Sequence, residues 1–134
     1  MFSRVLSRLF FSAQALSVLR AHSASCAPRE ACGALLGRGE RVFEALPLIN
    51  ASPTPSVAYL IGARELLSTE REAERLGLEV IGYFHSHPSS AARPSVRDLA
   101  EAVPGSVTVI VSGDEVTAWC ATGSAFKEIE VIDR

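Results

Sequence analysis

The sequence predicts an α/β (α+β) fold with a mixed, mostly antiparallel sheet of about seven strands flanked by about three helices. Short apolar runs bounded by glycine and proline recur along the chain, which is typical of strands. Two stretches instead show apolar residues at helical spacing, with capping residues at their ends. The chain has 134 residues, 48% apolar and 21% charged, which predicts one domain over 1–134 with a core that needs no disulfide.

The first 27 residues are interpreted as a strand followed by a helix over 12–22. Ser12 is a natural N-cap, and Leu16 and Leu19 recur at helical spacing, so we expect both leucines in the core. The alternative is an export signal or transit peptide that is removed, because two arginines precede an apolar patch. Polar residues interrupt that patch, which favours the folded interpretation.

The rest of the chain alternates strands, turns and two further helices. Glycines at 37 and 39 predict a hairpin between the first two of the remaining strands. Gly77 should end the first helix, with Leu66, Ala73 and Leu76 facing inward. We expect helices at 62–76 and 95–103, and strands at 31–36, 41–49, 57–61, 78–84, 107–111, 116–120 and 126–131.

Composition excludes several classes of function. The net charge of −2 argues against nucleic acid as a partner, since phosphate binding needs a basic face. No stretch approaches the roughly 18 uninterrupted apolar residues of a membrane span, so no membrane partner is expected. Cys26, Cys32 and Cys120 are odd in number and widely spaced, which predicts free thiols and a cytoplasmic protein. Asn50 begins an Asn-Ala-Ser glycosylation acceptor, which we attribute to chance because nothing else indicates secretion.

Two histidines and an aspartate form the most informative pattern. His85 and His87 stand two residues apart at the end of strand 78–84, a spacing that presents two imidazoles to one point. Asp98, on the first turn of helix 95–103, can bring a carboxylate to the same point. Two nitrogens and one oxygen suit Zn²⁺, and three protein ligands leave the fourth position to water, as in catalytic zinc sites.

A zinc-activated water also needs a group that takes its proton, and Glu30 is the candidate. It stands just before the apolar strand 31–36, where Gly33 could allow a substrate or neighbouring strand to approach closely. Each signal has an ordinary explanation: a His-x-His pair is often incidental, and Ser95-x-x-Asp98 is also a helix capping box. Their occurrence together at fixed spacing favours the zinc interpretation.

The sequence resembles the JAMM (MPN+) metalloprotease family. The family pattern is a glutamate, then His-x-His, seven residues, a serine, two residues and an aspartate, and the chain reproduces it without departure. The resemblance covers nearly the whole chain and implies a cytidine-deaminase-like JAMM/MPN fold. It is carried by Glu30-x-Cys32-Gly33-x-Leu35-x-Gly37, Gly82-Tyr83-Phe84-His85-Ser86-His87-Pro88 and Ser95-x-x-Asp98.

The resemblance implies a role for each residue of the pattern. His85, His87 and Asp98 would ligate one zinc ion, Glu30 would act as general acid and base, and Ser95 would donate a hydrogen bond to the oxyanion. Family members cleave amide bonds after the extended tail of ubiquitin or related sulfur-carrier proteins, so a ubiquitin-like protein or its conjugate is the expected substrate. Only 54 residues separate Glu30 from His85, which favours a compact prokaryotic-type enzyme.

Other functions compete with this one. An inactive scaffold of the same fold would normally lack a ligand or the glutamate, and every one is present here. A zinc deaminase would need Cys-x-x-Cys, which the sequence lacks. A thiol hydrolase that used Cys32 and His85 would leave the position of Asp98 unexplained. The sequence does not identify the substrate protein, and it leaves the oligomeric state open, including a homodimer.

Overall fold

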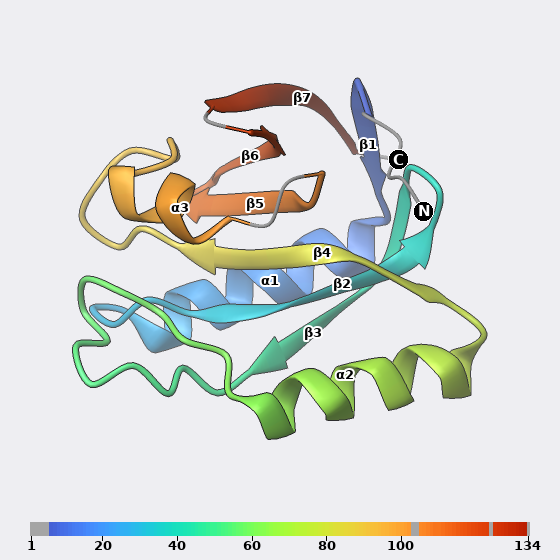
Figure 1. The fold of residues 1–134 in the computed structure, drawn as a ribbon, viewed down its shortest axis with the longest axis horizontal. Coiled ribbons are helices and arrows are strands. Elements are labelled where there is room, and N and C mark those ends of the chain that lie inside the picture. The colour runs from blue at the N-terminus through green and yellow to red at the C-terminus, as the bar shows by residue number, and fades with distance from the viewer. Residues whose placement is uncertain (1–5, 103–104, 124, 134) are drawn as a thin grey trace.

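A closed sheet of seven strands organises the protein in this computed structural model, which describes residues 6–102, 105–123 and 125–133 (Figure 1). No helix in those ranges is long and apolar enough to cross a membrane. Along the chain the elements are β1 (Arg8–Phe11), α1 (Ala13–Cys26), β2 (Cys32–Arg38), β3 (Arg41–Leu48), α2 (Ala63–Leu76), β4 (Glu79–Ser86), α3 (Val96–Glu101), β5 (Val107–Ser112), β6 (Glu115–Thr122) and β7 (Ala125–Asp133).

The strand order around the sheet is β1-β3-β2-β4-β5-β6-β7. Pairing is antiparallel for β2 with β3 and β4 and for β6 with β5 and β7, and it is parallel for β4 with β5. Strand β1 lies parallel to both β3 and β7 and closes the sheet. The predicted mixed, mostly antiparallel sheet with three helices is therefore confirmed.

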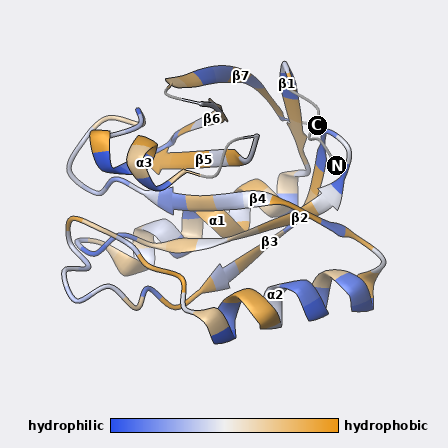
Figure 2. Cartoon of the chain, viewed as in Figure 1, coloured by the Kyte–Doolittle hydropathy of each residue, from blue (hydrophilic) through white to orange (hydrophobic). Residues whose placement is uncertain are grey.

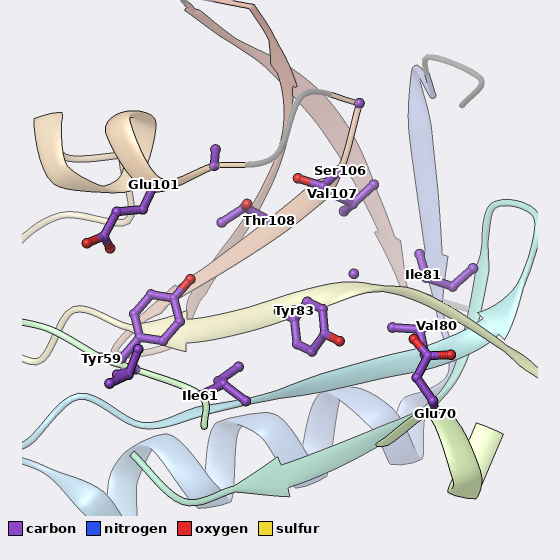
Figure 3. A pocket seen from close by; sticks show the side chains of 14 residues that line it. Tyr59, Ile61, Glu70, Val80, Ile81, Tyr83, Glu101, Ser106, Val107 and Thr108 are labelled. Carbon is purple, nitrogen blue, oxygen red and sulfur yellow. The ribbon is translucent and has the colours of Figure 1, made fainter. Parts of the chain in front are cut away.

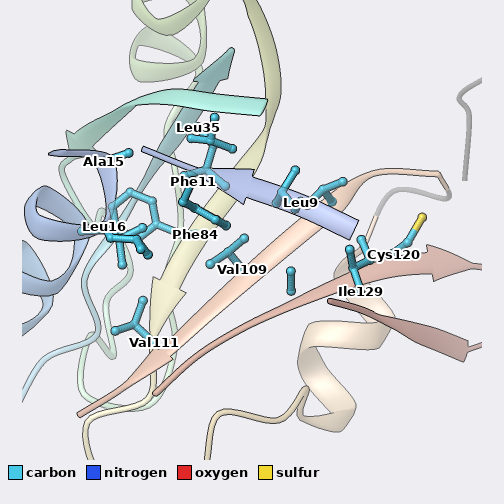
Figure 4. Packing of buried hydrophobic residues seen from close by; sticks show 14 residues of the cluster. Leu9, Phe11, Ala15, Leu16, Leu35, Phe84, Val109, Val111, Cys120 and Ile129 are labelled. Carbon is cyan, nitrogen blue, oxygen red and sulfur yellow. The ribbon is translucent and has the colours of Figure 1, made fainter. Parts of the chain in front are cut away.

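Residues 8–26 form a strand and a helix that are an integral part of this fold, as the folded interpretation predicted, while positions 1–5 of that prediction lie outside the described residues. Ser12 caps α1 by accepting a hydrogen bond from the backbone N–H of Ala15 at 3.1 Å. Leu16 and Leu19 are buried among strand residues of the main core, as expected (Figure 4). Because β1 supplies the closing strand and α1 fills the inner face, removal of either would open the core.

Helix α2 covers the outer face of the sheet, opposite α1 (Figure 1). Hydrophilic and hydrophobic residues alternate along it, whereas β5 is largely hydrophobic and β4 ends in a hydrophilic arrowhead (Figure 2). Ala73 is buried among apolar residues of β2 and β3, Leu76 packs against the same residues, and Gly77 ends the helix in the left-handed conformation, as predicted. The prediction for Leu66 is wrong: its side chain is 40% exposed, because the buried stripe of α2 passes through Thr69 and Ala73 instead.

The predicted strand 57–61 is also wrong, because this segment is a loop. Its backbone bonds to the side chain of Asn50 instead of to a neighbouring strand. The amide of Asn50 donates to the carbonyl oxygen of Ala58 at 3.0 Å, and its oxygen accepts from the N–H of Leu60 at 3.0 Å. Such local side-chain bonds compete with strand pairing, and here they fold the loop back on itself.

Helix α3 is shorter than the predicted 95–103, since it ends at Glu101 and position 103 lies outside the described residues. The three cysteines are free thiols in the structure, as predicted. Gly33 lies where β2 passes between β3 and β4, and a Cβ there would be 2.3 Å from the Phe84 ring and 2.5 Å from the Leu46 carbonyl oxygen. The close strand approach expected at Gly33 is therefore present.

Candidate functional site

Three potential metal ligands meet where β4 ends and α3 begins. Nε2 of His85 lies 3.2 Å from Nε2 of His87 and 3.1 Å from Oδ1 of Asp98. Nε2 of His87 lies 3.2 Å from Oδ2 of Asp98. A tetrahedral zinc site with bonds of about 2.0–2.1 Å has ligand atoms roughly 3.3–3.5 Å apart, so the three residues fit one such ion.

The backbone of the following loop and helix fixes two of these ligands. His87 donates its Nδ1–H to the carbonyl oxygen of Ala91 at 2.8 Å, which leaves Nε2 as the nitrogen available to a metal. Asp98 lies in a capping box with Ser95: its Oδ2 accepts from the Ser95 N–H at 2.8 Å, and its own N–H donates to Ser95 Oγ at 3.0 Å. The helix cap and the metal group therefore share the Asp98 carboxylate.

The charges of the site support one another. Burial acts to raise the pKa of Asp98, but hydrogen bonds from His85 and His87 outweigh it and hold that pKa well below the usual range. The hydrogen bond to Asp98 raises the pKa of His87, although burial opposes the rise. In the absence of metal, the aspartate is thus ionised and His87 takes up a proton readily.

Glu30 lines the same cavity, of about 290 Å³, together with His87, Ser95 and Asp98. Its side chain is buried, and burial raises its pKa, partly opposed by the nearby histidines. A carboxyl group with a raised pKa exchanges protons more readily at neutral pH than an ordinary surface glutamate. The structure therefore gives Glu30 an environment suited to general acid–base chemistry.

Ser86, between the two histidines, attaches the Glu30 segment to β4. Its Oγ accepts from the N–H of Ala31 at 2.7 Å, and its N–H donates to the Ala31 carbonyl oxygen at 3.0 Å. On the other side, the Glu30 N–H donates to the carbonyl oxygen of Pro55 at 2.7 Å, and its own carbonyl accepts from Asn50 at 3.0 Å. Glu30 is consequently held in register with the histidines.

The Cys32 thiol lies outside this site. Cys32 and His85 are paired on neighbouring strands, but the thiol is fully buried and lies 3.9 Å from the Leu48 carbonyl oxygen. Burial raises the pKa of Cys32 to about 12, so no useful fraction of thiolate forms at neutral pH. The thiol-hydrolase alternative is therefore excluded on chemical grounds.

A groove of about 690 Å³ leads to the cavity along the outer face of β4 (Figure 3). Tyr83 lines it from β4, Thr108 from β5, and Ile61 from the loop before α2. Tyr59 and Glu101 line both the groove and the cavity, so they stand where one opens into the other. An extended chain lying in the groove would thus reach the metal group between these two side chains.

Comparison with known proteins agrees with this geometry. A family model for prokaryotic homologs of the JAB domain matches residues 12–122. The chain belongs to this family. Its membership confirms the resemblance to JAMM metalloproteases seen in the sequence motifs.

Relatives of this Prok-JAB protein are similar over most of its length. The desampylase of Haloferax volcanii is 38% identical over 133 residues, 93% of this chain and 96% of the relative. A probable TtuB-protein conjugate cleaving protease of Thermus thermophilus is 40% identical over 104 residues, 78% of this chain and 70% of the relative. The solution structure of DSY2949 from Desulfitobacterium hafniense has a TM-score of 0.86 at 28% identity and covers 94% and 92% of the two chains.

Sequence reasoning missed two residues that the structure places at the site. Tyr59 stacks on the ring of His85, with centroids 4.4 Å apart and an angle of 19° between the planes. Asn50 bonds to Glu30 and to both neighbours of Tyr59 along the chain. The sequence signal at Asn50 was an Asn-Ala-Ser glycosylation acceptor, but in the structure the Asn50 side chain instead holds the loop around Tyr59.

Proposed function

We propose that this Prok-JAB protein is a zinc-dependent isopeptidase or peptidase that hydrolyses an amide bond at the C-terminal tail of a ubiquitin-like protein or its conjugates. One observation carries the proposal: the ligand atoms of His85, His87 and Asp98 lie 3.1–3.2 Å apart, close to the edge of a zinc tetrahedron. Two of these residues, His87 and Asp98, line a cavity that Glu30 also lines. The Thermus relative, a probable TtuB-protein conjugate cleaving protease, supports a protein conjugate as the substrate. The proposal treats residues 1–134 as one catalytic domain.

The chain's own residues account for the proton transfers. Zinc held by His85, His87 and Asp98 would lower the pKa of water and polarise the substrate carbonyl. Glu30 would accept a proton from the attacking water and then deliver it to the departing amine as the C–N bond breaks. The two steps need one carboxyl group that both accepts and releases a proton, which the raised pKa of Glu30 supports.

Ser95 would stabilise the oxyanion that forms from the carbonyl oxygen. Its Oγ already accepts a hydrogen bond from the Asp98 N–H, so its own O–H is free to donate to a substrate oxygen. It lines the cavity beside His87 and Asp98, where the substrate carbonyl would lie. The capping and the oxyanion roles therefore use different parts of one hydroxyl group.

The groove supports an extended tail as the recognised element. Its floor is the outer face of β4 and β5, and Tyr59 and Glu101 line both the groove and the cavity. We further propose a cytoplasmic location, which the three free thiols support, and no role for nucleic acid or membranes.

The test is cleavage of a defined substrate by zinc-loaded protein. Small ubiquitin-like proteins from the same source, each joined through its tail to a lysine side chain or to a peptide, are incubated with the protein and analysed by mass spectrometry. We expect cleavage directly after the tail, loss of cleavage with a chelator, and recovery on adding zinc. His85→Ala should bind less than one zinc and cleave nothing; zinc binding without any cleavage would favour an inactive scaffold.

A further inference from the structure

The two histidines of the metal group are held in different ways. His87 fixes its ring through the hydrogen bond from Nδ1 to Ala91, the usual arrangement for a metal-binding histidine. His85 has no such bond: its Nδ1 is buried and has no hydrogen-bond partner in the part of the chain that is described. Apart from the contacts of Nε2 within the metal group itself, no hydrogen bond among the described residues therefore fixes the plane of the His85 ring.

Tyr59 provides the contact that fits this need. Its ring lies nearly parallel to that of His85, with centroids 4.4 Å apart, while the His87 ring lies 5.0 Å from His85 at 56°. Rotation of the imidazole about its own side-chain bond would break the stacked contact with Tyr59. The stacking therefore fixes the plane of the His85 ring. The contact of Nε2 with Oδ1 of Asp98 at 3.1 Å then selects which edge of that ring faces the metal group.

Tyr59 belongs to a loop, so its own position depends on how that loop is held. The Asn50 side chain bonds to the carbonyl oxygen of Ala58 and to the N–H of Leu60, the two residues that flank Tyr59. The same amide group donates to the Glu30 carbonyl oxygen at 3.0 Å. One side chain thus connects the loop above His85 to the segment that carries the candidate general base.

We propose that Tyr59 is a positioning residue that orients His85 for metal binding through ring stacking, and that Asn50 holds Tyr59 in place. The inference deepens the proposed function and rests on it only in taking zinc as the ion. Tyr59 also borders the substrate groove, so the metal centre and the site of tail binding share one side chain. The flat ring is the essential feature of Tyr59, and its hydroxyl group is not.

The experiment measures zinc binding directly, without substrate. Wild-type protein, Tyr59→Phe and Tyr59→Leu are loaded with zinc, and the zinc dissociation constant and release rate are measured by competition with a chromogenic chelator. We expect Tyr59→Leu to bind zinc about tenfold more weakly, at the lower end of the range for residues that orient a metal ligand. Tyr59→Phe keeps the ring and should remain within about twofold of wild type, on the same principle.

Tyr83→Leu is the matched control. Tyr83 lines the same groove but makes no ring contact with either histidine among the described residues. We expect this variant to raise KM for a tail substrate and to keep the wild-type zinc release rate. Asn50→Asp retains the acceptor oxygen but loses both donated bonds, so it should speed zinc release without any change at Tyr59 itself.

Two results would overturn the proposal. The first is a zinc affinity of Tyr59→Leu equal to that of wild type. The second is a loss of affinity in Tyr59→Phe as large as in Tyr59→Leu, which would assign the effect to the hydroxyl group. A thermal melt of each metal-free variant checks folding, and Tyr59→Met replaces the leucine variant if that one does not fold. Because zinc binding is read without substrate, failure of the positioning role is distinguishable from failure of the proposed cleavage.

Discussion

Replacement of Ser95 separates its two roles, because alanine and glycine both remove the hydroxyl group but differ as helix caps. Alanine is a poor N-cap and should cost about 1 kcal/mol, whereas glycine costs only a few tenths. In a chain of this length, about 1 kcal/mol corresponds to a fall in Tm of roughly 3–5 °C. Ser95→Ala should therefore melt lower than wild type, and Ser95→Gly should melt close to it.

Catalysis should respond differently from stability. If the Ser95 hydroxyl group donates to the oxyanion, both variants lose that donor, and kcat should fall about 10²–10³-fold in each. The Asp98 carboxylate still accepts from the residue 95 N–H in both variants, so zinc affinity should change little. The assay is steady-state cleavage of a tail-linked substrate, with bound zinc measured in the same samples.

The glycine variant gives the decisive outcome for Ser95. Loss of an oxyanion donor should lower kcat far more than threefold. If kcat of Ser95→Gly stays within about threefold of wild type, Ser95 acts only as a cap. A large loss of zinc in Ser95→Gly would instead mean that the hydroxyl group serves the metal site through α3. Either result would refute the oxyanion role given to Ser95 here.

Two further predictions concern stability. Gly33→Ala should lower the free energy of unfolding in urea by about 3 kcal/mol, because the new Cβ would meet the Phe84 ring and the Leu46 carbonyl oxygen. Gly62→Ala is the control: it has open space around it and should lower the free energy of unfolding by less than about 1 kcal/mol. Equal losses in the two variants would contradict the close strand approach at Gly33. In the metal-free protein the hydrogen bond to Asp98 raises the pKa of His87, so protonated His87 stabilises the folded state. This stabilisation is complete below the ordinary histidine pKa of about 6.5 and disappears as pH rises through the raised pKa. Tm should thus fall from about pH 6 to pH 8, and Asp98→Asn should flatten that slope; an unchanged slope in Asp98→Asn would show that another group is responsible.

Local patterns were sufficient to predict most elements. Ser12 caps the start of α1 and Gly77 caps the end of α2, both through interactions within a few residues. These two helix boundaries therefore follow directly from the sequence. The Leu66 prediction failed because helical spacing alone does not tell which stripe of an exposed helix meets the sheet. The loop at 57–61 was missed because its structure depends on Asn50, several residues away, and apolar residues there are also typical of a strand.

The site residues were likewise predictable where a local pattern marks them, and not where only a distant contact does. Motif spacing identified the residues that meet at the end of β4, because the pattern spans one strand and the next helix turn. Tyr59 carries no comparable signal: its contact with His85 joins a loop and a strand that are 26 positions apart in the sequence. Contacts of this kind depend on how the whole chain folds, and a single sequence does not reveal them.

Glu30→Gln tests the central claim most directly. Glutamine keeps the size and hydrogen-bonding capacity of the side chain but accepts no proton at neutral pH. The measurement is single-turnover cleavage of a ubiquitin-like conjugate by the variant, with bound zinc quantified in the same sample. We predict one zinc per chain, unchanged substrate binding and a cleavage rate about 10²–10⁴-fold below wild type. Cleavage near the wild-type rate would show that Glu30 is not the base and would contradict the mechanism.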